Sequence, residues 1–141
     1  MSGRTITVRR RLAWGETDPA GVIYAPQAFH FAIAALEELW IEALGISFRD
    51  FLLRERKATP WVHNACDFAA PIFAGEAFTL TVAIEKLGAS SLAYRVEAAG
   101  ADGRARFSIK MVGAMIDLDT MKPCAIPDDI RAKLSPYVMT A

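Results

Sequence analysis

The longest apolar pattern in the chain runs from Gln27 to Leu44 and predicts a helix. With one residue about every 100°, its polar side chains fall within a sector of about 140°, and the rest of its surface is apolar. A helix with this pattern is a core helix that other elements cover. It is not a membrane span, because its longest unbroken apolar run, Phe31–Leu36, is far shorter than the roughly 18 residues that a span requires.

The flanking residues predict where the helices begin and end. Gly45 follows the long helix, and glycine is the residue type that stops a helix in the left-handed conformation. Ser47 is placed to cap a short second helix that ends near Lys57. Pro127 is placed in the first turn of a short terminal helix with the sequence DDIRAKL.

Elsewhere apolar and polar residues alternate with a period of two, which predicts five strands. The first strand reaches from about Arg4 to Trp14, although Arg10 interrupts its apolar face. The other four span about residues 61–69, 77–84, 92–98 and 104–118. Turns at residues 88–91 and 100–103 indicate that these four strands follow one another through hairpins.

Together these elements predict an α+β fold in a single domain, residues 1–141. Five antiparallel strands form one sheet. A helix that is apolar on most sides needs cover from more than one flat face, so we expect this sheet to curl around it.

Charge and composition narrow the classes of function. Lys plus Arg and Asp plus Glu both number 16, so the formal net charge is zero, which argues against binding of nucleic acid or an anionic membrane surface. The hydrophobic fraction of 53% is slightly high for a small domain, and such a surplus often lies in a subunit interface. We therefore expect a homo-oligomer.

Two further observations predict the compartment. The N-terminal sequence MSGRTITVRRR lacks the apolar segment of a signal peptide. The two cysteines, Cys66 and Cys124, lie far apart in the sequence and form no CxxC pair. Both observations predict reduced thiols in a cytoplasmic protein.

The candidate chemistry lies between the first strand and the long helix, in the segment WGETDPAGVIYAP, residues 14–26. Asp18, Pro19 and Gly21 occupy positions i, i+1 and i+3 of a type I turn. Pro19 excludes the helical conformation at Asp18 and so fixes the direction of its carboxylate. A D-P-x-G sequence alone is most often only a turn in which Asp bonds its own backbone. The order of elements and the aromatic residues around this turn favour a catalytic carboxylate.

The order of elements resembles the hotdog fold, and WGETDPAGVIYAPQAF resembles the active-site segment of acyl-CoA thioesterases of the 4-hydroxybenzoyl-CoA thioesterase type. In that family a strand ends in an aromatic residue, followed by a small residue, one or two acidic residues, Asp and then Gly. An aromatic-rich start of the central helix comes next. The matching residues are Trp14, Gly15, Glu16, Asp18, Pro19, Gly21 and Tyr24, and the resemblance covers about residues 5–118.

This resemblance implies hydrolysis of an acyl-CoA thioester without a serine nucleophile. Asp18 would act as the nucleophile on the thioester carbonyl or as the general base for a water. Backbone N–H groups at the start of the helix would form the oxyanion hole. Pro26 has no N–H, so the donors are expected around Tyr24, Ala25 and Gln27, and alignment with the family favours Ala25. No cofactor is implied, because coenzyme A is part of the substrate.

The resemblance also implies where the acyl group binds. Gly21, Phe29 and His63 are expected in the substrate pocket, although His63 also fits a histidine of the core. Phe29, Phe31 and Ile33 along the helix favour an aromatic or medium-chain acyl group over a short polar one.

Contacts with the CoA phosphates are expected in the turn between the third and fourth strands. Lys86, Ser90 and Ser91 are the candidates there, with Arg104 as a further cation. Some of these contacts are expected from a neighbouring subunit. The resemblance thus implies a homodimer or homotetramer with its sites at the subunit interface.

Several alternatives stay open. Glu16 is interpreted as a solvated loop carboxylate rather than a second catalyst. In another branch of hotdog thioesterases the catalytic acid lies on the central helix, which leaves Glu37 and Glu38 as second choices. A hydratase or dehydratase of acyl thioesters would pair Asp with a nearby downstream His, and the next one here is His30. A non-catalytic module that binds acyl thioesters is the third possibility.

Other classes of site are absent from the sequence. It contains no G-x-S-x-G nucleophile elbow, no P-loop and no G-x-G-x-x-G. Its two histidines, His30 and His63, are too few and too isolated to form a metal cluster with the distant cysteines. We therefore expect no metal site.

Overall fold

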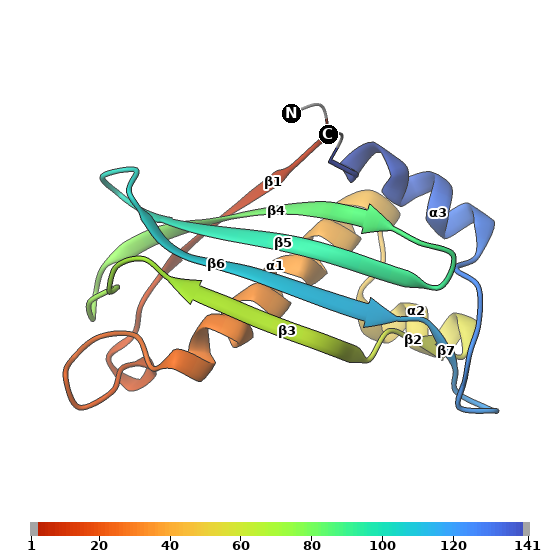
Figure 1. Ribbon diagram of the computed structural model, residues 1–141, viewed down its shortest axis with the longest axis horizontal. Coiled ribbons are helices and arrows are strands. Elements are labelled where there is room, and N and C mark those ends of the chain that lie inside the picture. The colour runs from red at the N-terminus through yellow and green to blue at the C-terminus, as the bar shows by residue number, and fades with distance from the viewer. Residues whose placement is uncertain (1–2, 140–141) are drawn as a thin grey trace.

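The structure is a computed structural model that describes residues 3–139. Five antiparallel strands form one sheet, and helix α1, Ala25–Leu44, lies across one of its faces (Figure 1). The strands are β1 (Ile6–Arg11), β3 (Trp61–Phe68), β4 (Ala77–Leu87), β5 (Ser91–Gly100) and β6 (Ala105–Ala114). Helices α2 (Phe48–Glu55) and α3 (Asp128–Leu134) lie at the end of the sheet where β4 turns into β5. The smaller elements are the 3₁₀ helices η1 (Trp14–Glu16) and η2 (Ser135–Tyr137) and the short strands β2 (Lys57–Ala58), β7 (Ile116–Asp117) and β8 (Lys122–Pro123).

The sheet order is β1-β4-β5-β6-β3, which corrects one prediction. Hairpins join β4 to β5 and β5 to β6, but β3 and β4 are not neighbours. The free edge of β4 is occupied by β1, with Val8 opposite Leu80. Strand β3 therefore pairs with β6 and forms the opposite edge of the sheet.

Two predicted strands are shorter than their sequence pattern. The first strand ends at Arg11, and Trp14 lies in η1 with an exposed fraction of 79%. The last strand breaks after Ala114, and the residues that follow pair as β7 with β2. In both places the alternation of apolar residues continues beyond the point where the backbone leaves the sheet.

The predicted helix boundaries agree closely with the structure. Gly45 ends α1 with a φ of 75°, the left-handed conformation that favours glycine. The Ser47 hydroxyl accepts a hydrogen bond from the Asp50 N–H at 3.1 Å and caps α2. Pro127 directly precedes α3. Helix α2 ends at Glu55 rather than near Lys57, because Lys57 belongs to β2.

Helix α1 is buried along one stripe rather than on most sides. It packs mainly against helix α3 and against strands β1, β4 and β6. Ile41 on its far side has an exposed fraction of 43%, and Phe29 and Ile33 are half-buried. The buried stripe consists of Ala28, Phe31, Ala32, Ala35, Leu36, Leu39 and Trp40. The side of α1 that carries Ile41 is thus left uncovered in the single chain, and β3 is not among the elements that mainly contact α1. The curl of the sheet stays a prediction.

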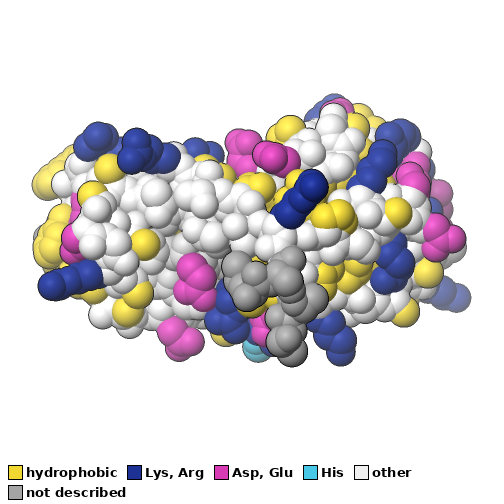
Figure 2. All heavy atoms as spheres, turned by 90° about the horizontal axis from the view of Figure 1, so that it is seen from above, with side chains coloured by type: hydrophobic (Ala, Val, Ile, Leu, Met, Phe, Trp, Pro, Cys, Tyr) yellow, Lys and Arg dark blue, Asp and Glu magenta, His cyan; other side chains and the backbone are white. Residues whose placement is uncertain are grey.

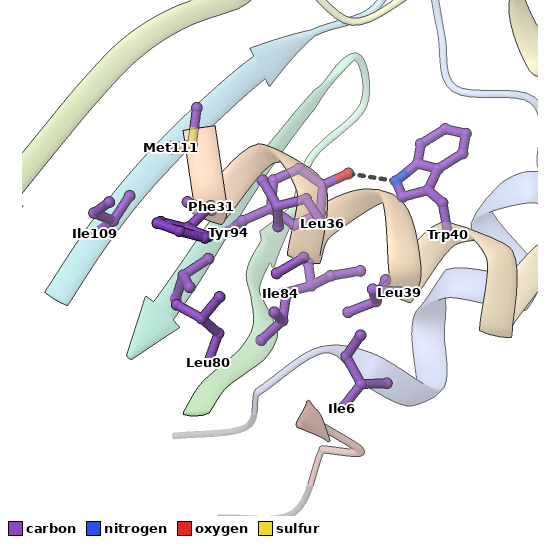
Figure 3. Packing of buried hydrophobic residues seen from close by; sticks show 14 of the residues in the cluster. Ile6, Phe31, Leu36, Leu39, Trp40, Leu80, Ile84, Tyr94, Ile109 and Met111 are labelled. Atoms are coloured by element: carbon purple, nitrogen blue, oxygen red, sulfur yellow. Dashed lines mark hydrogen bonds between the residues drawn. The ribbon is translucent and has the colours of Figure 1, made fainter. Parts of the chain in front are cut away.

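The core joins α1 to the sheet through one buried polar contact. Trp40 Nε1–H donates to the Tyr94 hydroxyl at 2.8 Å, and both side chains are fully buried (Figure 3). Burial raises the pKa of the Tyr94 hydroxyl well above its usual range, although the hydrogen bond from Trp40 opposes this shift. Tyr94 therefore stays protonated.

We expect Tyr94→Phe to lower the free energy of unfolding by about 1–3 kcal/mol, because the buried Trp40 N–H would lose its acceptor. Urea unfolding followed by circular dichroism measures this change. The control is Tyr24→Phe, at a tyrosine with an exposed fraction of 53%. This control should stay within about 0.5 kcal/mol of wild type. Equal effects of the two substitutions would contradict the prediction.

A bulge in β3 decides which of its side chains face the helix. Asn64 and Phe68 lie opposite the buried Met111 and Phe107 of β6, and so share the inner face of the sheet. The register shifts between Trp61 and His63. This extra residue also turns Trp61 inward, where its ring packs edge-on against Tyr94 with the centroids 5.8 Å apart.

Charged side chains of both signs alternate over the face shown in Figure 2, without a large region of one sign. This distribution agrees with the zero formal net charge. Within residues 3–139, no helix is long and apolar enough to cross a membrane.

Candidate active site

The loop before α1 is held by its own side chains. Glu16 Oε1 accepts a hydrogen bond from the Ala13 N–H at 2.8 Å, and the Thr17 hydroxyl donates to the Trp14 carbonyl at 2.7 Å. Both bonds close η1. Glu16, interpreted from sequence as a solvated carboxylate, is therefore a structural group that shapes this loop.

Asp18 forms the predicted turn and also borders a groove. The Gly21 N–H donates to the Asp18 carbonyl at 2.9 Å, and Gly21 has a φ of 80°. The Ala20 N–H donates to Asp18 Oδ1 at 2.8 Å. Asp18 Oδ2 has no hydrogen-bond partner within residues 3–139. One carboxylate oxygen thus orients the side chain, and the other is available to a ligand.

The groove has a volume of about 390 Å³ and joins the Asp18 loop, the start of α1 and the end of β3. Its walls are mainly apolar. It is lined by Asp18, Val22, Ile23, Ala25, Phe68, Ala69, Ala70 and Pro71. Gly21 shapes the turn beside this groove and is not among its lining residues.

The backbone amides at the start of α1 differ in their bonding. The Tyr24 N–H donates to the Glu16 carbonyl at 3.0 Å, and the Gln27 N–H donates to the Tyr24 carbonyl at 2.8 Å. Pro26 has no N–H. The Ala25 N–H has no acceptor among the described residues, and Ala25 lines the groove. Of the three donors considered from sequence, Ala25 alone combines an unbonded N–H with a place in the groove.

The far wall of the groove is held by a pair of charged residues, and no pattern in the sequence predicts their contact. The Ala69 and Ala70 N–H groups both donate to the Arg106 carbonyl, at 2.8 and 3.2 Å. The Arg106 guanidinium donates to Glu76 Oε2 at 2.7 Å, and Glu76 Oε1 accepts from the Phe73 N–H at 3.0 Å. Arg106 therefore positions this wall.

Phe29 does not line the Asp18 groove. It lines a second cavity, which has a volume of about 400 Å³. Its other lining residues are Ile33, Trp61, Asn64 and Met111. Phe31, predicted from sequence as part of the apolar acyl site, is a core residue that packs edge-on against Phe78 with the ring centroids 5.1 Å apart.

His63 is exposed, so its interpretation as a core histidine is wrong. It lies opposite Val112, and therefore on the other face of the sheet from Asn64. It lines neither the Asp18 groove nor the second cavity. Alternation along β3 could not identify this orientation, because the bulge shifts the strand by one residue.

The alternative helix carboxylates have other contacts. Glu37 Oε2 accepts a hydrogen bond from the Phe48 N–H at 3.1 Å and so ties α1 to α2. Glu38 lies 3.9 Å from the Arg10 guanidinium. Neither carboxylate lines the Asp18 groove.

The three candidates for CoA binding lie far from Asp18 within one chain. Lys86, Ser90 and Ser91 surround the β4–β5 turn, at the opposite end of the sheet from the Asp18 loop (Figure 1). Arg131 of α3 is beside this turn, where its guanidinium donates to the Gly88 carbonyl at 2.6 Å. Arg131 is thus a further cation beside the β4–β5 turn. The turn lies away from the Asp18 groove of the same chain.

Cys66 lies between Phe68 and Asn64 on the inner face of β3. Burial, together with the neighbouring Asp67 carboxylate, raises the pKa of its thiol to about 11. The thiolate is the reactive form. In a Cys124→Ser background, alkylation by iodoacetamide should therefore be slow near neutral pH and rise with a midpoint at about 11. Asp67→Asn should lower this midpoint, because it removes the neighbouring negative charge. A wild-type midpoint at about 8.5, the usual thiol pKa, would contradict the raised pKa of Cys66.

Comparison with known proteins places this chain in a family. The sequence profile of the thioesterase-like superfamily matches residues 12–134, a range that includes Asp18, α1 and strands β3 to β6. The chain belongs to the thioesterase-like superfamily. This membership and the relatives below confirm the predicted thioester hydrolase and its hotdog-like fold. The narrower resemblance to the 4-hydroxybenzoyl-CoA thioesterase type stays a prediction.

Relatives of this thioesterase-like protein include 1,4-dihydroxy-2-naphthoyl-CoA hydrolases. The protein from Nostoc punctiforme is 28% identical over 126 residues, which cover 89% of this chain and 84% of the relative. The protein from Prochlorococcus marinus is 28% identical over 132 residues, which cover 89% of this chain and 86% of the relative.

Solved structures share the fold of the thioesterase-like chain. A thioesterase superfamily protein from Jannaschia sp. has a TM-score of 0.89 at 25% identity, with 96% of this chain and 94% of that chain covered. A 1,4-dihydroxy-2-naphthoyl-CoA thioesterase from Synechocystis has a TM-score of 0.84 at 23% identity, with 94% and 96% covered. A Staphylococcus aureus protein solved in complex with CoA has a TM-score of 0.89 at 13% identity, with 100% and 90% covered.

Proposed function

We propose that this protein is an acyl-CoA thioesterase whose catalytic carboxylate is Asp18 and whose oxyanion donor is the Ala25 N–H. One observation carries the proposal. Within residues 3–139, Asp18 has an unbonded carboxylate oxygen and Ala25 an unbonded backbone N–H, and both residues line the same apolar groove at the start of a helix. Such a pair supplies the attacking group and the charge stabilisation that thioester hydrolysis needs.

Two routes use this geometry. In the first, Asp18 Oδ2 attacks the thioester carbonyl carbon, the resulting oxyanion accepts from the Ala25 N–H, and collapse expels the CoA thiolate. Water then hydrolyses the acyl-aspartyl anhydride to the free acid. In the second, Asp18 takes a proton from a water that attacks the same carbonyl. The positive end of the α1 dipole favours the negative charge in both routes.

The acyl group in this proposal is aromatic or medium-chain. The walls of the groove are mainly apolar, and the next cavity along α1 contains Phe29 and Ile33. The relatives from Nostoc and Prochlorococcus act on a naphthoyl thioester. A protein of the same fold was solved in complex with CoA, which supports CoA as the leaving group.

The proposed enzyme is a homodimer, or a homotetramer built from such dimers, paired through edge strand β3. This strand pairs only with β6 within residues 3–139, and Val62 and Phe68 on it have exposed fractions of 64% and 49%. Antiparallel pairing of two β3 strands would reverse the second copy. Its β4–β5 turn would then lie on the same side as Asp18 of the first copy. Sedimentation equilibrium should give at least twice the chain mass, and a monomer at micromolar concentration would contradict this arrangement.

The cytoplasmic location belongs to the same proposal. It is supported by two free thiols, at Cys66 and Cys124.

A panel of CoA thioesters with a thiol reagent tests the activity. Benzoyl-, naphthoyl- and octanoyl-CoA should be hydrolysed with higher kcat/KM than acetyl-CoA. Equal rates across the panel would overturn the acyl preference, and saturable binding without release of CoA would indicate a binding module. A hydratase is not favoured, because neither His30 nor His63 lines the Asp18 groove.

A further inference from the structure

The Asp18 groove and the second cavity follow one another along a single seam between α1 and β3. Ala25 lines the groove, and Phe29, four residues later on the same helix face, lines the second cavity. Phe68 lines the groove, and Asn64, four residues earlier on the same strand face, lines the second cavity. Both elements therefore present one continuous side to a ligand that extends from Asp18.

The second cavity has one polar side chain among its lining residues. Phe29, Ile33, Trp61 and Met111 are apolar, and Asn64 contributes a carboxamide. Asn64 makes no side-chain hydrogen bond within the described part of the chain, residues 3–139. When an acyl group fills this cavity, it covers the Asn64 carboxamide. The carboxamide then needs a hydrogen-bond partner on the acyl group, because an unpaired polar group is costly to bury.

We propose that Asn64 determines specificity by hydrogen-bonding a ring hydroxyl of an aromatic acyl group, at a position remote from the thioester. This inference rests on the proposed function. The flat apolar surfaces of Phe29 and Trp61 suit an aromatic ring, and the carboxamide both donates to and accepts from a hydroxyl.

The spacing along the seam favours a ring hydroxyl at the para position, remote from the thioester carbonyl, over one at the ortho position beside it. Ala25 and Phe29 are one helical turn apart, about 6 Å along the axis. Asn64 and Phe68 are about 13 Å apart along the strand. A hydroxyl ortho to the thioester carbonyl would lie beside Asp18, whereas a para hydroxyl points along the seam toward Asn64.

The test compares benzoyl-, 2-hydroxybenzoyl- and 4-hydroxybenzoyl-CoA in the wild type and in Asn64→Leu. The ratio of kcat/KM for 4-hydroxybenzoyl-CoA to that for benzoyl-CoA should fall about tenfold in the variant, because a substrate hydroxyl loses its partner. The ratio for 2-hydroxybenzoyl-CoA should not change. Comparing ratios between proteins cancels the intrinsic reactivity of each thioester.

Asp67→Leu is the matched control. It replaces a polar side chain by the same apolar one, although it also removes a negative charge, on the opposite face of the same strand, and should keep the wild-type ratio. A ratio unaltered in Asn64→Leu would overturn the role of Asn64 and leave the proposed function standing. A wild type that hydrolyses none of the thioesters would overturn the proposed function and this inference with it.

Discussion

Asp18→Asn should lower kcat about 10³-fold, because the amide neither attacks a thioester nor takes a proton from water. The fold should be unaffected. Asn keeps the side-chain oxygen that accepts the Ala20 N–H, and the backbone bond that closes the turn does not involve the side chain. Steady-state release of CoA measures kcat, and circular dichroism with a thermal melt measures the fold.

The control for this substitution is Asp129→Asn, which makes the same change at an exposed carboxylate on α3. It should keep wild-type kcat. Asp18→Asn with unchanged kcat would remove Asp18 from the chemistry. Mass spectrometry of intact protein during turnover separates the two routes, since an acyl adduct forms only if Asp18 is the nucleophile.

Ala25→Pro should lower kcat by about 10²–10³, the usual effect of losing one oxyanion donor. The substitution removes a single N–H. The helix should tolerate proline here, because Ala25 is its first residue and proline is favoured at that position. Tyr24 has a ψ of 123°, an extended conformation that suits the residue before a proline.

Ala25→Gly is the matched variant, since it changes the side chain but keeps the N–H. It should retain kcat within a few fold of wild type, so that the two variants differ by the donor itself. If both variants lost activity equally, the effect would come from the shape of the loop. If both stayed fully active, the oxyanion would have another donor.

Local signals in the sequence predicted most of what surrounds Asp18. The turn depends on Asp18, Pro19 and Gly21, which lie within four residues, and its hydrogen bonds form as expected. The end of α1 at Gly45 and the cap of α2 at Ser47 depend on equally local preferences. Interactions of this kind need no knowledge of distant residues.

The sequence did not predict features that depend on pairing between distant segments. Strand β3 lies at the edge of the sheet because β1 pairs with the free side of β4. Strands β1 and β4 are far apart in the sequence. The bonding of the Tyr24 N–H depends on where the Glu16 carbonyl lies after the loop folds. The pair of Arg106 and Glu76 joins strand β6 to the loop before β4 at the groove wall. Periodicity carries no information on any of these contacts.

The bulge in β3 breaks the usual relation between the spacing of two residues along a strand and the face of the sheet on which they lie. It allows Trp61 and Asn64, which are an odd number of residues apart, to face the same side. Removing one residue at the bulge would rotate Trp61 toward solvent and leave Asn64, Phe68 and Asp18 in place. A single deletion could therefore reshape the distant part of the seam during evolution or engineering without disturbing the reacting groups.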